Sequence, residues 1–257
     1  MAPMIGVFDS GIGGLGVLRE MLPDFAADHV VYAADRVNAP YGTRSLDEVR
    51  GLAHLHARTL IGAGATTLVL ACNTASAAAL DSLRGEFPST RFVGMEPAIK
   101  PAASASDTGK IGVLATAATF QGRLFASLLD QYAEGIEVIT RAAPEWVTLV
   151  ESGHVNGREV IDQIRAHTSP LLDAGADTLV LGCTHFTFLV DAISDVVGPQ
   201  VTIIDPAHAV ARQARLVHTE DCHEGSLRAM VSGDASQFAE LSKTVAGISF
   251  PDGVLPL

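Results

Sequence analysis

The sequence AGATTLVLAC at residues 63–72 is followed 111 residues later by AGADTLVLGC at residues 174–183, and the two agree at eight of ten positions. Each reads as a helix end or turn, then a short run of β-forming residues centred on Leu-Val-Leu, then a small residue and a cysteine. The chain therefore carries a duplicated strand, with Cys72 at the end of one copy and Cys183 at the end of the other.

Two thiols in equivalent positions suit one kind of chemistry. An enzyme that interconverts mirror images removes a proton from one face of a carbon and returns one to the opposite face, so it needs two similar acid/base groups on opposite sides. The duplicated strand supplies such a pair.

The composition is that of an ordinary globular protein, with 48% hydrophobic and 18% charged residues in a chain of 257. The formal net charge is −12 and no basic run occurs, which argues against nucleic acid and anionic membranes as partners. No stretch approaches the roughly 18 apolar residues of a membrane span, and the start lacks the features of a secretory signal. We therefore expect a cytoplasmic protein.

Three cysteines form no disulfide framework, and in a reducing compartment they are buried hydrophobes, metal ligands or reactive thiols. Cys222 lies in a polar stretch without a motif and is expected to be structural. A zinc site built from Cys72, Cys183 and His185 lacks further spaced ligands, so no metal is expected.

Runs of β-forming residues alternate with helical patterns along most of the chain, which is typical of α/β folds with helices on both faces of a mostly parallel sheet. A capping box of Ser45 and Glu48 predicts a helix that runs to about residue 61, and Asp205 before Pro206 predicts another helix start. The expected strands are residues 4–8, 30–34, 67–71, 92–95, 111–115, 138–140, 178–182 and 201–204.

A second, weaker repeat supports duplication, because Ile-Gly-Val occurs at residues 5–7 and again at 111–113, each time before a small-residue turn and a helix. We therefore expect two similar, doubly wound lobes with a seam near residues 96–110. Ligands of such sheets bind at the carboxyl ends of the strands, where both cysteines lie.

The turn at residues 11–16, Gly-Ile-Gly-Gly-Leu-Gly, formally matches the dinucleotide fingerprint, with Asp35 at the end of the next strand. Asp9 places a carboxylate where a pyrophosphate would be repelled. Two other interpretations stay open. The glycines could serve only strand-to-helix packing, or the backbone N–H groups and Ser10 could hold a small anion while Asp9 receives its ammonium group or orients a base.

Hydrogen-bonding residues follow each repeated thiol, as Asn73 and Thr74 after Cys72 and as Thr184 and His185 after Cys183. Backbone amides at a helix N-terminus bind carboxylate and lower the pKa of a neighbouring thiol. Either cysteine could instead be a core residue.

Two other segments have plain structural interpretations. Tyr41 and Gly42 lie in a predicted turn that carries an exposed aromatic hydroxyl. Glu151 could be a solvated helix residue.

Together these motifs resemble the glutamate racemases of the cofactor-independent aspartate/glutamate racemase superfamily. His185 and the Ala-Ser pair at residues 75–76 are similar to the glutamate branch, since aspartate racemases generally have Glu in place of His185. The chain departs from the family at Ala143, commonly Cys, and at Thr187, commonly Pro. The matching segments are residues 6–15, 34–42, 71–77, 96–97, 149–151 with 153, and 182–186.

The resemblance implies two pseudosymmetric α/β lobes with the active site between them, residues 1–97 with 208–257 forming the first and residues 98–207 the second. It implies cofactor-free interconversion of L-glutamate and D-glutamate, which supplies D-glutamate for peptidoglycan, and we expect a homodimer. The chain begins its first strand by residue 5, so activation by a peptidoglycan precursor is not expected.

The resemblance also implies the roles of individual residues. Cys72 and Cys183 would be the two bases, Asp9 and His185 would assist the first and second thiol, and Glu151 would support the second. The residues implied to line the substrate pocket are Asp9, Ser10, Tyr41, Gly42, Asn73, Thr74, Thr184 and His185.

Two alternatives remain. The enzyme could racemise aspartate or a broader set of acidic amino acids, because pocket depth cannot be read from the sequence. The chain could also be a non-catalytic amino-acid sensor, although binding alone needs neither thiol.

Overall fold

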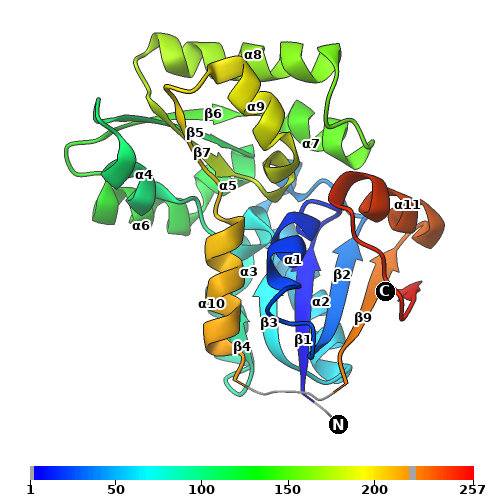
Figure 1. The fold of residues 1–257 in the computed structure, drawn as a ribbon. Helices are drawn as coiled ribbons and strands as arrows, with labels where there is room; N and C mark the ends of the chain where they lie inside the picture. The colour runs from blue at the N-terminus through cyan, green and yellow to red at the C-terminus, as the bar shows by residue number, and fades with distance from the viewer. Residues whose placement is uncertain (1–2, 220–223) are drawn as a thin grey trace.

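The computed structural model describes residues 3–219 and 224–257, and within these ranges the strands form two separate sheets (Figure 1). The first sheet has the order β10-β9-β2-β1-β3-β4 and the second the order β6-β5-β7-β8. The strands of the first are β1 (Met4–Asp9), β2 (His29–Asp35), β3 (Ala65–Leu70), β4 (Arg91–Val93), β9 (Ser226–Ser232) and β10 (Val254–Pro256). Those of the second are β5 (Lys110–Ala115), β6 (Glu137–Ala142), β7 (Thr178–Gly182) and β8 (Thr202–Ile204).

Neighbouring strands pair in parallel throughout both sheets, so the predicted α/β class with mostly parallel sheets is confirmed. The two sheets also share one strand order, because β2-β1-β3-β4 corresponds to β6-β5-β7-β8. The repeated segments found in the sequence become β3 and β7, and the two Ile-Gly-Val segments lie in β1 and β5. Strands β9 and β10, which the sequence patterns did not predict, extend the first sheet beyond β2.

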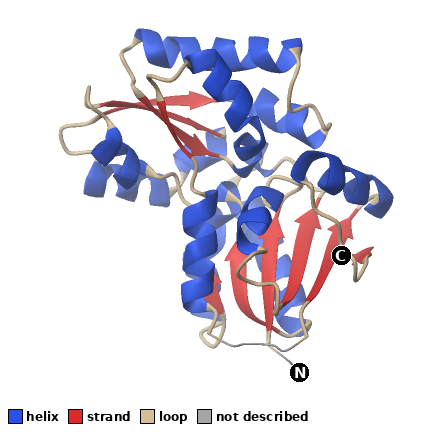
Figure 2. Cartoon of the chain, in the orientation of Figure 1, coloured by secondary structure: helices blue, strands red, loops and turns tan. Residues whose placement is uncertain are grey.

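Helices cover both faces of each sheet (Figure 2). One core cluster joins helices α1, α10 and α11 on the first sheet to α7, α8 and α9 on the second, so the two halves share a continuous apolar interior. The helices are α1 (Leu15–Met21), η1 (Tyr41–Thr43), α2 (Leu46–Gly62), α3 (Asn73–Glu86), α4 (Ile99–Ala105), α5 (Ala117–Gln121), α6 (Arg123–Tyr132), α7 (Pro144–Glu151), α8 (Arg158–Asp173), η2 (Thr184–Leu189), α9 (Val190–Val197), α10 (Ala207–Val217) and α11 (Ala235–Ala246).

The ends of several helices follow the sequence signals. Ser45 and Glu48 form both hydrogen bonds of the predicted capping box at the start of α2. Asp205 accepts the Ala207 N–H at 2.9 Å. The helix α10 begins at Ala207 with Pro206 as its N-cap, one residue later than predicted. After Cys183 the chain forms the 3₁₀ helix η2 before α9, rather than an α-helix directly.

The duplication extends to packing inside the sheets. A Cβ added to Gly6 of β1 would lie 2.5 Å from Leu68 Cδ2, and one added to Gly112 of β5 would lie 2.7 Å from Leu179 Cδ2. Leu68 and Leu179 are themselves equivalent in the repeat. Each glycine therefore makes room for the same leucine of the neighbouring strand.

This packing predicts that replacing glycine with alanine has opposite effects on the free energy of unfolding at Gly6 and at Gly51. Gly6→Ala should lower the free energy of unfolding by about 1–3 kcal/mol, because the core must shift to accept a methyl group. Gly51→Ala, in the exposed middle of α2 where an added Cβ meets nothing within 4 Å, should raise it by about 0.5–1 kcal/mol through helix propensity. Urea titration of both variants checks the prediction, and equal effects would contradict it.

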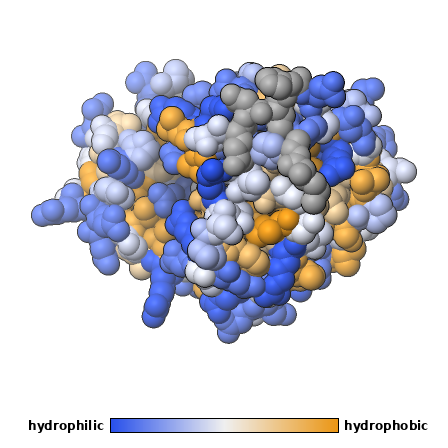
Figure 3. All heavy atoms as spheres, turned by 90° about the horizontal axis from the view of Figure 1, so that it is seen from below, coloured by the Kyte–Doolittle hydropathy of each residue, from blue (hydrophilic) through white to orange (hydrophobic). Residues whose placement is uncertain are grey.

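Within the described residues, no helix is long and apolar enough to cross a membrane. The end of the molecule at the bottom of Figure 1 presents mostly hydrophilic residues, with hydrophobic ones in small groups (Figure 3).

Candidate active site

The carboxyl ends of β1 and β3 in the first sheet and of β5 and β7 in the second meet at one small cavity. In sheets of this order, ligands bind where the direction of strand succession reverses, which here is between β1 and β3 and between β5 and β7. The cavity measures about 20 Å³ and is lined by Ser10, Pro40, Tyr41, Gly42, Cys72, Asn73, Thr74, Thr116, Val147, Cys183, Thr184 and His185.

Cys72 lies at the start of α3 as its N-cap, and it is 5% exposed. Its sulfur accepts the Ala75 N–H at 3.5 Å, and its thiol donates to Ser10 Oγ at 3.9 Å. Burial raises the pKa of Cys72, and the nearby carboxylate of Asp9 raises it further. In this closed arrangement Cys72 therefore favours the protonated thiol, which can act as an acid.

Cys183 has a different partner. Its sulfur lies 3.7 Å from His185 Nδ1, and His185 Nε2 lies 2.7 Å from Glu151 Oε1 at the end of α7. Burial alone would lower the pKa of His185, but the side-chain hydrogen bonds with Cys183 and Glu151 leave that pKa well above its usual range. A protonated imidazole can stabilise a thiolate beside it, and His185 is in position to do this for Cys183.

Asp9 is fully buried at the end of β1, and its Oδ2 accepts the N–H groups of Gly11 and Gly14 at 3.0 Å each. Its other oxygen, Oδ1, has no hydrogen-bond partner among the described residues. Burial raises the pKa of Asp9, although His185 and the two backbone donors oppose this. Asp9 can therefore take up a proton more readily than a carboxyl group in water.

Three backbone N–H groups of the glycine turn are bound by acidic side chains of the chain itself. The N–H groups of Gly11 and Gly14 bind Asp9, and the N–H of Ile12 donates to Glu151 Oε1 at 2.8 Å. An added Cβ on Gly11 would meet Glu151, and one on Gly13 would meet His185 and Thr184. The glycines thus bring the turn against α7 and η2, which leaves no space at these positions for a pyrophosphate.

Asp35, the acidic residue of the apparent fingerprint, is buried among donors of its own chain. Its carboxylate lies 2.9 Å from His56 Nε2 and accepts hydrogen bonds from Ser232 at 2.8 Å and Tyr41 at 2.7 Å. Burial would raise the pKa of Asp35, but these hydrogen bonds lower it strongly. The expectation of an exposed Tyr41 hydroxyl is wrong, because the ring is 1% exposed and its hydroxyl binds Asp35.

Polar side chains that could receive an amino acid lie on both sides of the cavity. Both side-chain polar atoms of Asn73 are buried without a hydrogen-bond partner among the described residues. Thr74 Oγ1 lies 3.1 Å from Thr116 Oγ1, a residue that the sequence analysis did not single out. The Ile-Gly-Val repeat could have found Thr116, because it follows β5 where Ser10 follows β1.

A cavity of this size holds about one water molecule, since one water needs roughly 10–15 Å³ of such space. This volume is smaller than an amino acid. Pro40 and Val147 also line an adjoining cavity of about 230 Å³, with Arg36, Ala39, Thr148, Glu151 and Ser152.

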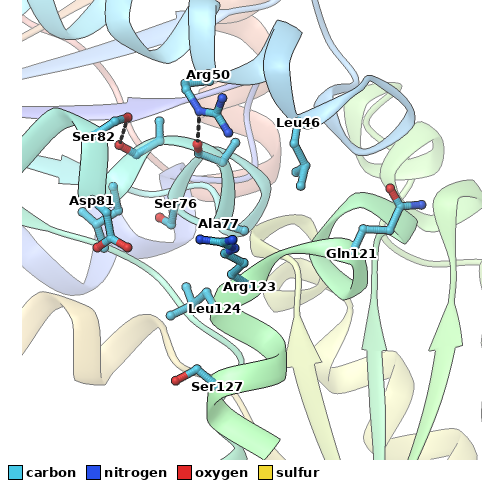
Figure 4. Close-up of a pocket in the computed structure, with 13 residues that line it drawn as sticks. Leu46, Arg50, Ser76, Ala77, Asp81, Ser82, Gln121, Arg123, Leu124 and Ser127 are labelled. Carbon is cyan, nitrogen blue, oxygen red and sulfur yellow. Dashed lines mark hydrogen bonds between the residues drawn. The ribbon is translucent and has the colours of Figure 1, made fainter.

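A larger cavity of about 670 Å³ lies between helices α2, α3 and α6 and contains neither Cys72 nor Cys183 (Figure 4). Arg50 on its wall is engaged by the protein itself, because its Nε donates to the Ala78 carbonyl at 2.9 Å and its NH1 to Asp47 at 2.7 Å. Chemistry rather than size therefore identifies the candidate site.

In the described part of the chain, no group of three or more His, Cys, Asp or Glu side chains is arranged to hold a metal ion. Cys222, expected from the sequence to be structural, lies outside the described residues.

Known proteins resemble this chain over most of its length. The family model described as Asp/Glu/hydantoin racemase matches residues 9–214. The glutamate racemase of Roseiflexus sp. (strain RS-1) is 44% identical in an alignment of 244 residues, with coverage of 92% of this chain and 90% of that protein.

Two solved structures resemble the whole chain. Escherichia coli glutamate racemase, in complex with L-glutamate and the activator UDP-MurNAc-Ala, has a TM-score of 0.87 at 28% identity and covers 100% of this chain and 98% of its own. Francisella tularensis glutamate racemase, in complex with D-glutamate, has a TM-score of 0.83 at 26% identity, and the match covers 100% of this chain and 97% of that one. The chain therefore belongs to the Asp/Glu/hydantoin racemase family, and its resemblance to the glutamate racemases is confirmed.

Proposed function

We propose that this protein interconverts L-glutamate and D-glutamate by proton transfer between Cα and two thiols, Cys72 and Cys183. The observation that carries the proposal is that these cysteines end equivalent strands, β3 and β7, and line one cavity. A substrate held between them would present one face of Cα to each sulfur.

The choice of glutamate is supported by the relatives, which are glutamate racemases, and by the two related structures that contain L-glutamate and D-glutamate. The pairing of His185 with Glu151 beside Cys183 supports it as well, because the resemblance to the glutamate branch implies these two residues as the partners of the second thiol. Asn73, Thr74, Thr116 and Thr184 offer neutral donors and acceptors for the substrate carboxylates and ammonium group.

The reaction proceeds in two proton transfers. In one direction the Cys183 thiolate takes the Cα proton, leaving the electron pair on Cα, and the Cys72 thiol delivers its proton to the opposite face. In the other direction the two thiols exchange roles. His185 assists proton transfer to and from Cys183, and Asp9 assists proton transfer to and from Cys72. Each of the two residues is buried and lies beside the thiol that it assists.

The Cα proton is weakly acidic, so the site must stabilise the carbanion strongly. Hydrogen bonds to the α-carboxylate, removal of water and positioning between the thiols are the means available to these side chains. We propose that no cofactor takes part, because the glycine turn is filled by Glu151 and His185.

The division into two lobes, the oligomeric state and the cellular role are also proposals. The division into residues 1–97 with 208–257 and residues 98–207 is supported by the pairing of β9 with β2 and by the separate second sheet. We propose a cytoplasmic homodimer that supplies D-glutamate for peptidoglycan.

Purified protein in deuterium oxide tests the function. Starting from either pure enantiomer, optical rotation should decay to zero, and early product should carry deuterium at Cα while the remaining substrate keeps its proton. Thermal stabilisation by glutamate without any change in rotation would instead indicate a sensor. Equal rates with aspartate would make the protein a broader acidic amino-acid racemase.

A further inference from the structure

A partly buried arginine that the sequence motifs did not indicate, Arg36, lies on the far side of Glu151 from His185. Arg36 follows β2, and its Nε lies 3.6 Å from Glu151 Oε2. The two side chains are 13% and 17% exposed, so solvent screens their attraction only partly.

The two oxygens of Glu151 have different partners. Oε1 accepts the Ile12 N–H at 2.8 Å and lies 2.7 Å from His185 Nε2. Oε2 faces Arg36. The orientation of the carboxylate, and with it the hydrogen bond to His185, therefore depends on what holds the second oxygen.

Arg36 is anchored so that it can hold that oxygen. Its NH1 donates to Gln237 Oε1 of α11 at 3.1 Å, while Nε is buried and lacks a hydrogen-bond partner among the described residues. A separation of 3.6 Å is an ion pair but too long for a hydrogen bond. The adjoining cavity of about 230 Å³, lined by both side chains, gives them room to approach.

Charge supports the same role. Arg36 is the single Lys or Arg among the described residues that line the thiol cavity or the cavity beside it. A guanidinium at this distance favours the ionised form of Glu151, and an ionised Glu151 favours a protonated His185. The protonated imidazole then stabilises the thiolate of Cys183.

We propose that Arg36 is a positioning residue for the Cys183 side of the reaction, acting through Glu151 and His185 and not on the substrate. The proposal rests on the two-thiol function. It predicts a much larger effect on one enantiomer, because the contacts of Arg36 lead to His185 beside Cys183, whereas Cys72 is affected only indirectly, through the charge of Asp9.

The test uses a substrate that reports on one proton removal at a time. When a thiolate takes the Cα proton of 3-chloroglutamate, the electron pair of the C–H bond forms a C=C bond and chloride leaves with the C–Cl pair. The enamine then hydrolyses to 2-oxoglutarate and ammonia, which are measured. The enantiomer that fails with Cys183→Ser identifies the Cys183 side.

Arg36→Met should lower kcat for that enantiomer by about ten- to a hundred-fold, as outer partners of a reacting group do, with little change in KM. The other enantiomer should stay within about two-fold of wild type. Arg36→Lys, which keeps the charge, should recover part of the loss. Arg158→Met is the matched control, because the Arg158 side chain is 95% exposed on α8.

If Arg36→Met lowers kcat equally for both enantiomers, Arg36 has a merely structural role and the proposal is overturned. Unchanged kcat for both enantiomers would also overturn it. The ¹⁵N signals of the His185 imidazole provide a readout without substrate, and they should shift in Arg36→Met but not in Arg158→Met. If wild-type protein processes neither enantiomer while the imidazole signals still shift, the proposed function fails and the coupling of Arg36 to His185 stands.

Discussion

Replacing Cys72 or Cys183 with serine is expected to lower glutamate racemisation at neutral pH by at least about a thousand-fold. A hydroxyl is a far weaker base than a thiolate, and each turnover needs both groups. Both sulfurs line the cavity, and a substrate bound between them presents one face of Cα to each. Neither thiol can therefore reach the face that the other serves. The measurement is optical rotation from each pure enantiomer, with glutamate binding followed separately by calorimetry.

Cys222→Ser is the matched control, since it makes the same chemical change outside the duplicated strands. It should leave kcat near wild type. Both active-site variants should still bind glutamate, because the proposed carboxylate and ammonium partners remain. Wild-type turnover by either variant would rule out the two-thiol assignment.

Asp9→Asn and His185→Asn should each lower kcat by roughly ten- to ten-thousand-fold, in the range of a general acid/base contribution. The two variants affect different sides, because Asp9 lies near Cys72 and His185 lies 3.7 Å from Cys183. The ratio of kcat values for the two directions should therefore shift oppositely. Since the equilibrium constant between enantiomers is one, kcat/KM falls equally in both directions and the KM ratio shifts with the kcat ratio.

Steady-state kinetics from both enantiomers measures these changes, and His208→Asn, at a 79% exposed side chain, is the control for histidine loss. Unchanged kcat in both directions, with changes in KM alone, would mean that Asp9 and His185 only bind substrate.

The duplicated strand made the fold and the two thiols predictable. Eight matching positions in ten, each ending in a cysteine, specify equivalent strands, and the carboxyl ends of parallel strands are where ligands bind. Strands β9 and β10 escaped detection because they are largely half-buried or exposed and lack a clear apolar pattern.

The partners of the site were harder to predict than its thiols. That Glu151 reaches His185 depends on Gly11 and Gly13, whose missing side chains let α7 and η2 approach the turn, and no local pattern reveals such a long-range contact. Arg36 has an ordinary sequence context, and only the folded chain brings it to Glu151. The burial of Tyr41 depends on the hydrogen bond from its hydroxyl to Asp35, which the turn sequence around Tyr41 does not indicate.

The most direct test of the central claim, that each thiol serves one face of Cα, is the elimination of 3-chloroglutamate by the single cysteine variants. Each enantiomer needs only the thiol that removes its proton. We predict that Cys72→Ser keeps activity on one enantiomer and loses it on the other, and that Cys183→Ser shows the opposite pattern. Equal loss on both enantiomers in both variants would contradict the account.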